Sequence, residues 1–183
     1  MAAVTTVTRA VPIREFPRQI RHQGHAIECH VVGTTHDYAA VTGLKMDRGR
    51  FLTDAYNAAA QNHIVVSSEV AQALFPEEDP VGKSVKVGTD YYTVVGVVKQ
   101  ANDLKDNVYM PLMTCRLRFG ERIVNNRAGR VEAVETQLSQ LILEVRDAAD
   151  AEATAALVKS TLQPHHPKGD VEVVILKPDR KTR

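Results

Sequence analysis

Apolar residues along this chain occur in short blocks separated by glycine, proline and small polar residues. This pattern predicts several short strands and few long helices. The predicted strands are all short and lie at 4–11, 19–22, 26–33, 64–66, 84–87, 91–98 and 108–112. The segments at 84–87 and 91–98 are separated by Gly88, Thr89 and Asp90, so they are expected to form a hairpin.

Helix signals in the first half are local and brief. Asp37 can cap a single turn that ends before Gly43. Ser67 and Ser68 can cap a helix over 69–75, on which the apolar residues are spaced for one buried face. Pro76 ends that helix, whereas the stretch at 57–60 is expected to be a small polar loop.

The C-terminal part has the pattern of a strand–helix–strand unit. A strand is predicted at 140–145, then a helix capped by Asp147 or Asp150 that continues to Leu162, and a last strand at 171–176. Such a βαβ unit predicts an α/β lobe at this end of the chain. The polar stretch at 125–129, which ends in glycine, is expected to be an excursion or a linker.

Composition narrows the class of protein. The 183 residues are 44% hydrophobic and 25% charged, which is typical of a globular chain with one large domain or two small ones. The formal net charge of +1 gives no strong field for nucleic acid, and the 5% aromatic content without tryptophan disfavours a base-stacking surface. The longest strongly apolar run, at 91–98, is far short of the ~20 residues that span a bilayer. Residues 1–5 also lack the basic start and apolar core of a signal peptide.

The two cysteines, Cys29 and Cys115, match no zinc-binding spacing and are too few for a disulfide framework. Two interpretations stay open. In an oxidising compartment they could pair, and closure of so long a loop would add roughly 4 kcal/mol of stability. Otherwise they are two separate small apolar residues, with Cys29 on the same buried strand face as Ile27 and Val31.

No set of residues predicts catalysis or cofactor binding. Gly82, Lys83 and Ser84 resemble the end of a phosphate-binding loop, but the glycine that such a loop needs five residues earlier is Glu77. The residues after Ser84 also read as a strand where that loop requires a helix. Neither a dinucleotide-binding GxGxxG motif nor a GxSxG nucleophile motif occurs in the sequence. We therefore expect no catalytic and no cofactor-binding residues.

The clusters of histidine, acidic and basic residues are interpreted as solvated positions and not as metal-binding or catalytic sites. Seven histidines occur without an HExxH pattern or a helical i, i+4 pair, so no metal site is expected. The acidic turn of Glu77, Glu78 and Asp79 has no apolar surroundings that would perturb a carboxyl group. His165 and His166 are expected in an exposed loop. The basic residues after position 176 are interpreted as a solvated end, although a chain approaching a membrane has the same pattern.

One combination of motifs does point to a family. Leu74-Phe75-Pro76 is followed by Asp79-Pro80-Val81-Gly82-Lys83 and then by Val94-Val95-Gly96-Val97-Val98. The segment from Val108 to Leu112 and the strand–helix–strand of 140–176 follow in order. Across about three-quarters of the chain, this order resembles the extracytoplasmic core domain of MacB-type ABC-transporter permeases, a group that includes FtsX-like and lipoprotein-releasing permeases.

The resemblance implies an α+β fold with two lobes. A split α/β lobe, called Porter in this family, would be built from both chain ends at 1–52 and 130–183. A β-rich lobe, called Sabre, would be inserted at 53–129. The family's extracytoplasmic domain lies between the first and second transmembrane helices of the permease, so the chain is expected on the periplasmic face of the inner membrane, as a soluble fragment of a membrane protein.

The resemblance also implies a function that is not enzymatic. Such domains transmit the motion driven by a cytoplasmic ATPase subunit, through transmembrane helices that this chain lacks, to a periplasmic adaptor or to a lipoprotein or peptide substrate. The complete permease is expected to be dimeric and the isolated domain monomeric. Two alternatives remain, a stand-alone lipid- or lipoprotein-binding module and a small enzyme whose site forms only in three dimensions. The sequence names neither the substrate nor the contact surface.

Overall fold

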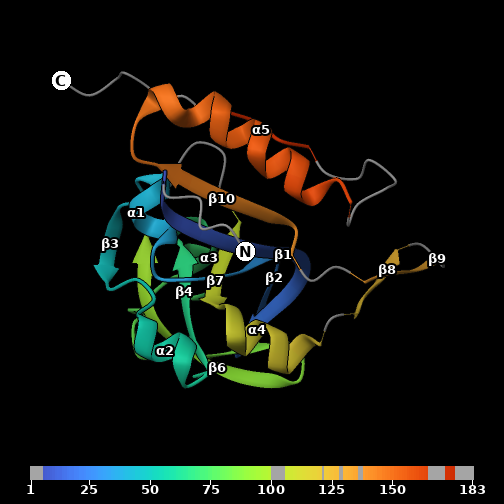
Figure 1. The fold of residues 1–183 in the computed structure, drawn as a ribbon. Helices are drawn as coiled ribbons and strands as arrows, with labels where there is room; N and C mark the ends of the chain where they lie inside the picture. The colour runs from blue at the N-terminus through green and yellow to red at the C-terminus, as the bar shows by residue number, and fades with distance from the viewer. Residues whose placement is uncertain are drawn as a thin grey trace. The chain divides into compact units, whose positions relative to one another are not determined.

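A mixed β-sheet is the framework of this α+β fold (Figure 1). The computed structural model describes residues 6–99, 106–120, 122–127, 130–135, 138–164 and 172–175. Within these residues eight strands form one sheet in the order β10-β1-β2-β7-β4-β6-β3, and β5 pairs with both β1 and β6. The strands of this sheet are β1 (Val7–His22), β2 (His25–Thr34), β3 (Met46–Gly49), β4 (His63–Ser67), β5 (Ser84–Val87), β6 (Asp90–Val98), β7 (Asn107–Pro111) and β10 (Gln140–Val145). The pairs β2–β7 and β4–β6 are parallel.

The remaining elements are short. The helices are α1 (Tyr38–Thr42), α2 (Asp54–Ala58), α3 (Ser68–Leu74), α4 (Leu112–Phe119), the 3-10 turn η1 (Ala148–Asp150) and α5 (Ala151–Leu162). A separate antiparallel hairpin consists of β8 (Arg122–Arg127) and β9 (Arg130–Glu135). No helix in the described part of the chain has both the length and the apolar character needed to cross a membrane.

The chain divides into two units by its internal contacts. One unit combines both chain ends, Met1–Ala10 and Leu143–Arg183, and the other is Val11–Ile142. A unit assembled from both ends is the arrangement that the split-lobe expectation describes. The lobe boundaries expected at 52/53 and 129/130 stay a prediction. Strands from both sides of position 53 nevertheless share the main sheet, because β2 pairs with β7 and β3 pairs with β6.

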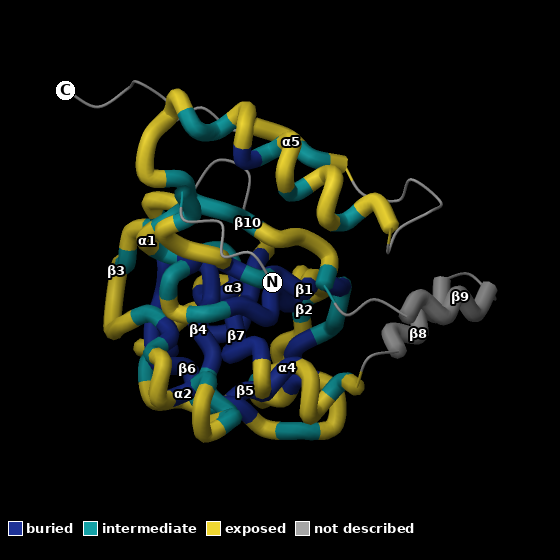
Figure 2. Tube along the Cα trace, in the orientation of Figure 1, coloured by how far each residue is buried: buried dark blue, intermediate teal, exposed yellow. Residues whose placement is uncertain are grey.

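Two apolar clusters cover the two faces of the sheet in the unit Val11–Ile142. On one face, Phe16 and Ile20 of β1 pack with residues of α3 and α4. On the other face, Val11 and Ile13 pack with Tyr38 of α1 and with α2. The central strands β2, β4, β6 and β7 form the dark blue, buried part in Figure 2. Along β6, Val94 and Val97 belong to the first cluster and Val95 and Val98 to the second, so the strand is covered on both sides as the sequence predicted.

The local helix signals were reliable where a cap and an apolar stripe coincided. The Oγ of Ser67 accepts a hydrogen bond from the backbone N–H of Val70 at the start of α3, and the helix ends before Pro76. Asp147 caps η1 by accepting from the N–H of Ala149 at 3.1 Å, and Asp150 occupies the N-cap of α5. The predicted hairpin of β5 and β6 and the predicted strand β10 are present.

Four sequence-based expectations were wrong in whole or in part. The loop expected at 57–60 overlaps α2, which Thr53 caps and the buried Tyr56 anchors. The strand expected to end at 112 stops at Pro111, and α4 follows immediately. The separate segments expected at 4–11 and 19–22 are joined in the single 16-residue strand β1. Residues 172–175 form no strand, so the predicted βαβ unit is not formed there.

Several other expectations fall on positions that the structure does not describe. Residues 4–5, 171 and 176 of the predicted terminal strands lie outside the described residues. So do 128–129 of the polar stretch, whose other residues belong to β8. His165, His166 and the basic residues at 177–183 also lie outside them.

Candidate functional site, a basic pocket beside β1

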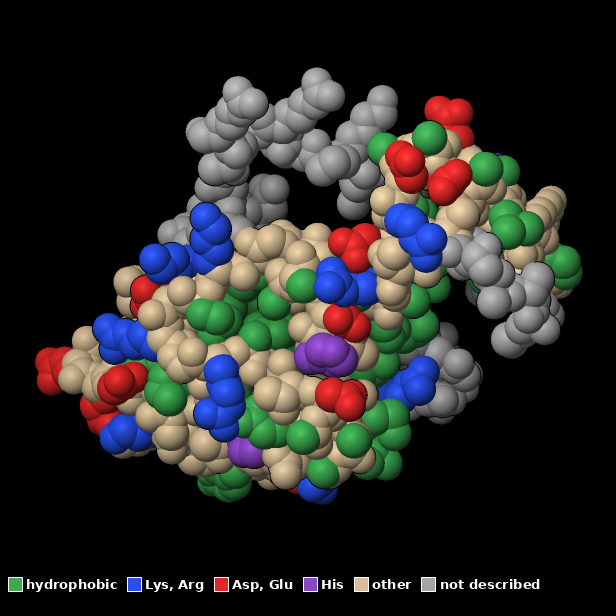
Figure 3. Space-filling model, turned by 60° about the vertical axis from the view of Figure 1, so that its left-hand side comes forward, with side chains coloured by type: hydrophobic (Ala, Val, Ile, Leu, Met, Phe, Trp, Pro, Cys, Tyr) green, Lys and Arg blue, Asp and Glu red, His purple; other side chains and the backbone are tan. Residues whose placement is uncertain are grey.

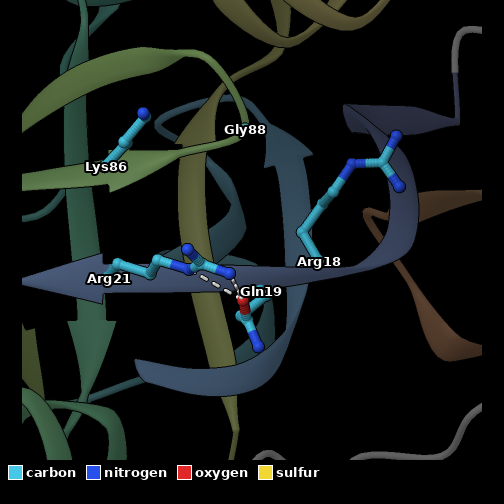
Figure 4. A pocket seen from close by; sticks show the side chains of 5 residues that line it. All are labelled: Arg18, Gln19, Arg21, Lys86 and Gly88. Carbon is cyan, nitrogen blue, oxygen red and sulfur yellow. Dashed lines mark hydrogen bonds between the residues drawn. The ribbon is translucent and has the colours of Figure 1, made fainter. Parts of the chain in front are cut away.

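A hollow of about 340 Å³ lies beside β1, where this strand meets β5 (Figure 4). Its lining residues come from β1 and from β5 with the turn that follows, and they are Arg18, Gln19, Arg21, Lys86 and Gly88. Three of the five are cationic. In Figure 4, Arg21 lies along β1 toward Gln19, and Lys86 extends from the adjacent strand.

The pocket occupies a gap in strand pairing at the outer edge of β1. On this edge the backbone N–H of Ser139 donates to the carbonyl of Ile13, and the N–H of Glu15 donates to the Ser139 Oγ at 2.9 Å. Pairing with β5 begins at Ile20, which faces Val87. Residues 16–19 therefore have no neighbouring strand on this side among the described residues.

Pro17 lies in the middle of this gap. Proline has no N–H to contribute to a sheet, so it is tolerated where a strand has an open edge. The Nη1 of Arg18 donates to the Pro17 carbonyl oxygen at 3.1 Å. The Arg18 side chain thus covers part of the open edge of β1. What remains there is a pocket lined by side chains and not a free strand edge.

Aromatic rings hold the guanidinium of Arg18. Its Cζ lies 5.1 Å from the ring centroid of Phe16 and 5.7 Å from that of Phe119. The two rings are themselves in contact, with centroids 5.1 Å apart. A guanidinium above an aromatic ring is attracted to the electron-rich ring face, and this contact fixes the side chain without cancelling its charge.

The other two cations are also held by uncharged groups. Arg21 Nε donates to the Oε1 of Gln19 at 2.8 Å, and Arg21 Nη2 donates to the same oxygen. Lys86 Nζ lies 5.9 Å from the ring centroid of Tyr91. Arg21 and Lys86 face each other directly across the β1–β5 pair. Like charges in that position destabilise a sheet.

Arg14 adds a fourth cation to the same strand. Its side chain is fully buried, and its Nε, Nη1 and Nη2 have no hydrogen-bond partner among the described residues. Its Cζ lies 5.6 Å from the centroid of Phe16, so two guanidinium groups share this ring. In the described part of the chain the ion pairs involve other residues, and Arg14, Arg18, Arg21 and Lys86 take part in none of them. Arg14 does not line the pocket, and the three lining cations alone make the pocket suited to binding an anion.

The residues singled out from the sequence lie elsewhere. Lys83 pairs with Glu78 at 2.5 Å, and this hydrogen bond lowers the pKa of the Glu78 carboxyl. Gly82 adopts a φ of 84° in the turn before β5, so the Gly82-Lys83-Ser84 segment enters a strand. Glu77, Glu78 and Asp79 are exposed, as predicted for a solvated turn.

The two cysteines are buried and free in this structure. Burial raises the pKa of the Cys29 thiol to about 12 and that of Cys115 to about 11, so both are protonated at neutral pH. The Sγ of Cys29 donates to the carbonyl of Arg18 at 3.2 Å. No group of three or more His, Cys, Asp or Glu side chains is placed to hold a metal ion within the described residues.

The sequence did not single out the residues of the pocket. Arg14 and Arg18 share one strand face with Phe16, but Lys86 is far away along the chain and reaches β1 only through the β1–β5 pairing. On the face that Figure 3 shows, by contrast, basic and acidic side chains are interspersed. What distinguishes the pocket is that, within the described residues, none of its three lining cations takes part in an ion pair, although Glu28 lies opposite Gln19 across the β1–β2 pair.

The family model for the MacB-like periplasmic core domain matches residues 1–161. The chain belongs to this family. It is 31% identical over 161 residues to the macrolide export ATP-binding/permease protein MacB of Rhodospirillum rubrum, a match that covers 84% of this chain and 23% of that protein. The chain thus spans about a quarter of the length of the curated relatives it matches first.

Solved structures show the same fold. The extracellular domain of the noncanonic ABC-type transporter YknZ from Gram-positive bacteria matches with a TM-score of 0.75 at 21% identity, covering 90% of this chain and 79% of that one. The periplasmic region of MacB from Actinobacillus actinomycetemcomitans matches with a TM-score of 0.73 at 20% identity, covering 92% and 72%. The α+β architecture expected from the resemblance is confirmed.

These matches establish what the chain is at the level of the family. It is the periplasmic domain of a MacB-like ABC transporter permease, on the extracytoplasmic side of the membrane. Its named relatives are permease proteins, and the MacB relatives are ATP-binding permeases.

Proposed function

We propose that this domain is non-catalytic and couples ATP hydrolysis in the cytoplasm to a partner or substrate outside the membrane. The observation that supports the proposal is the basic pocket beside β1. This pocket is lined by cations that uncharged groups hold in place, which suits recognition of a ligand rather than a reaction. The two buried thiols are protonated, so neither is poised as a nucleophile.

The names of the relatives also support a role in ATP-driven transport. The Rhodospirillum rubrum protein is named for macrolide export and for ATP binding, and this chain corresponds to 23% of its length. We infer that the ATPase lies in the part of the permease outside this chain and that motion reaches the domain through transmembrane helices. We further propose that the complete permease acts as a pair, while the isolated domain is a monomer.

The test uses the whole permease that carries this domain, reconstituted in proteoliposomes with its ATPase. In one variant a short linker replaces the domain, and in a second arrangement a monovalent antibody fragment raised against the domain is added to the unaltered permease. We expect transport to be lost in both cases while basal ATP hydrolysis persists, because the ATPase is intact but uncoupled.

The antibody arm keeps the test decisive if the linker variant fails to assemble. Transport that continues at the wild-type rate with the domain saturated by the fragment would overturn the coupling role. Turnover of a substrate by the isolated chain, with no permease present, would instead establish the enzymatic alternative.

A further inference from the structure

We infer that the basic pocket beside β1 binds the carboxylates of an acidic polypeptide segment from an extracytoplasmic partner. The inference names the chemistry of the partner and rests on the proposed function only for the existence of that partner. Direct binding to the pocket can be tested without the permease.

Within the part of the chain that the structure describes, none of the cations that line the pocket takes part in an ion pair. Each cation is held by neutral groups: Arg18 by two aromatic rings and a carbonyl, Arg21 by the amide of Gln19, and Lys86 by the ring of Tyr91. Surface arginines and lysines ordinarily have water or a carboxylate as partners. Arg18 is held by its aromatic rings and Arg21 by Gln19, whereas Lys86 is exposed, so a ligand has less side-chain freedom to remove at the two arginines, and this lowers the entropic cost of binding there.

Arg21 and Lys86 are two like charges that directly oppose each other. These residues face each other in register across antiparallel strands, where like charges repel. An oxyanion near both side chains would convert the repulsion into two attractions. Gln19 accepts from the Nε and from one N–H of the Nη2 of Arg21. The remaining edge of this guanidinium, formed by Nη1 and the second N–H of Nη2, can still present paired donors to a planar carboxylate.

The volume of the pocket indicates the size of the ligand that it can hold. A volume of about 340 Å³ corresponds to roughly ten molecules of liquid water, which exceeds the size of a single small anion. The cations are also spread out, because Arg21 and Lys86 face each other across the β1–β5 pair, whereas the Arg18 side chain extends away from both in Figure 4, toward Phe16 and Phe119. Several carboxylates on one flexible segment match that distribution better than one isolated ion does.

The open edge of β1 does not favour recognition by strand addition. Pro17 lacks the N–H that an added strand would need, and its carbonyl already accepts from Arg18. Recognition must therefore depend on side-chain charges. An acidic segment is the polypeptide that such a pocket selects, and its attachment should weaken as ionic strength rises.

The experiment is isothermal titration calorimetry of the full 183-residue chain with hexaglutamate as the probe. Hexaglutamine and inorganic phosphate are the comparison ligands, each measured at low and at physiological salt. Arg21→Gln and Lys86→Gln test the pocket, and Lys45→Gln is the matched control because Lys45 is exposed and does not line the pocket. Thermal melts confirm that every variant is folded.

We expect hexaglutamate to bind in a salt-sensitive manner and hexaglutamine not to bind. Each pocket variant should weaken the affinity by about tenfold or more, the value of one charge-assisted hydrogen bond. Lys45→Gln should leave the affinity unchanged. The second pocket variant maintains the test if the first one alters folding.

Three results would overturn the inference. Binding that is absent, or equally weakened by Lys45→Gln, would show that the pocket is not the site. Phosphate that binds as tightly as hexaglutamate would make it a site for a small oxyanion instead. In the reconstituted permease, normal transport by the Arg21→Gln, Lys86→Gln double variant would remove the pocket from partner recognition, even if the antibody experiment upheld coupling.

Discussion

Replacing Arg14 by methionine should stabilise the protein. The Arg14 side chain is completely buried in the unit Val11–Ile142, and none of its three guanidinium nitrogens has a hydrogen-bond partner in the part of the chain that the structure describes. Arginine stays protonated in proteins, so it cannot escape this cost by losing its charge. Methionine keeps an unbranched apolar stem of similar shape and removes the unsatisfied donors.

The expected magnitude follows from two opposing contributions. Each buried, unsatisfied donor costs about 1–3 kcal/mol, and Arg14 has donors on three nitrogens. The substitution also removes the cation–π contact with Phe16 at 5.6 Å, which is worth about 0.5–2 kcal/mol. Replacement of buried ionic groups by well-packed apolar residues typically stabilises proteins by about 1–4 kcal/mol, and we expect a net gain in this range.

The assay is thermal unfolding followed by circular dichroism in a low-salt buffer without multivalent anions. For a chain of this size, Tm should rise by about 2–4 °C for each kcal/mol gained. The control is Arg48→Met, an exposed arginine whose ion pairs with Asp47 and Asp79 are both 3.7 Å long. Its effect should stay within about 0.5 kcal/mol. A Tm for Arg14→Met that equals or falls below the wild-type value would refute the reasoning, because it would show that Arg14 has a partner in solution.

Two further predictions concern packing and protonation. Gly96→Ala should lower the free energy of unfolding by about 1–3 kcal/mol in chemical denaturation, because the added Cβ would collide with the Arg50 carbonyl. Gly24→Ala is the control, because no atom of the described residues lies within 4 Å of the added Cβ there, and equal effects of the two substitutions would contradict the prediction. Desolvation, with a smaller contribution from Arg50, lowers the pKa of His63 below its ordinary 6.5. The unfolded chain therefore binds a proton at His63 that the folded chain does not, so stability falls as pH drops below about 6.5. NMR titration should give a low midpoint for His63, which Arg50→Gln raises, whereas a midpoint at or above 6.5 would exclude this account.

The sequence predicted elements whose signals are contained within a few residues. The start of α3 was recognisable because Ser67 supplies a cap just before an apolar stripe. By contrast, α4 follows Pro111 without such a cap, and its residues Leu112, Thr114 and Cys115 are buried through tertiary contacts. Strand β1 was split in the prediction because its polar residues and prolines conceal its continuity.

The pocket could not be predicted from local patterns because it depends on two long-range events. Pairing of β1 with β5 brings Lys86 opposite Arg21, and packing of α4 brings Phe119 over Arg18. Each cation alone reads as an ordinary solvated residue. The family motif, in contrast, was recognisable because Asp79-Pro80-Val81-Gly82 encodes a turn locally, through the fixed φ of proline and the positive φ of Gly82.

The near-zero net charge of the chain does not argue against an acidic partner. Charges further apart than about 8–10 Å are largely screened at physiological salt, so the balance of basic and acidic residues over the whole surface says little about one pocket. What a ligand meets is the local set of Arg18, Arg21 and Lys86, none of which is paired with a carboxylate among the described residues. The same screening limits the distance over which the charges of the pocket act. The field of a chain with a net charge of +1 does not steer a partner from afar, but within a Debye length the exposed Arg21 and Lys86 attract an acidic segment, so added salt should slow its association and thereby weaken binding.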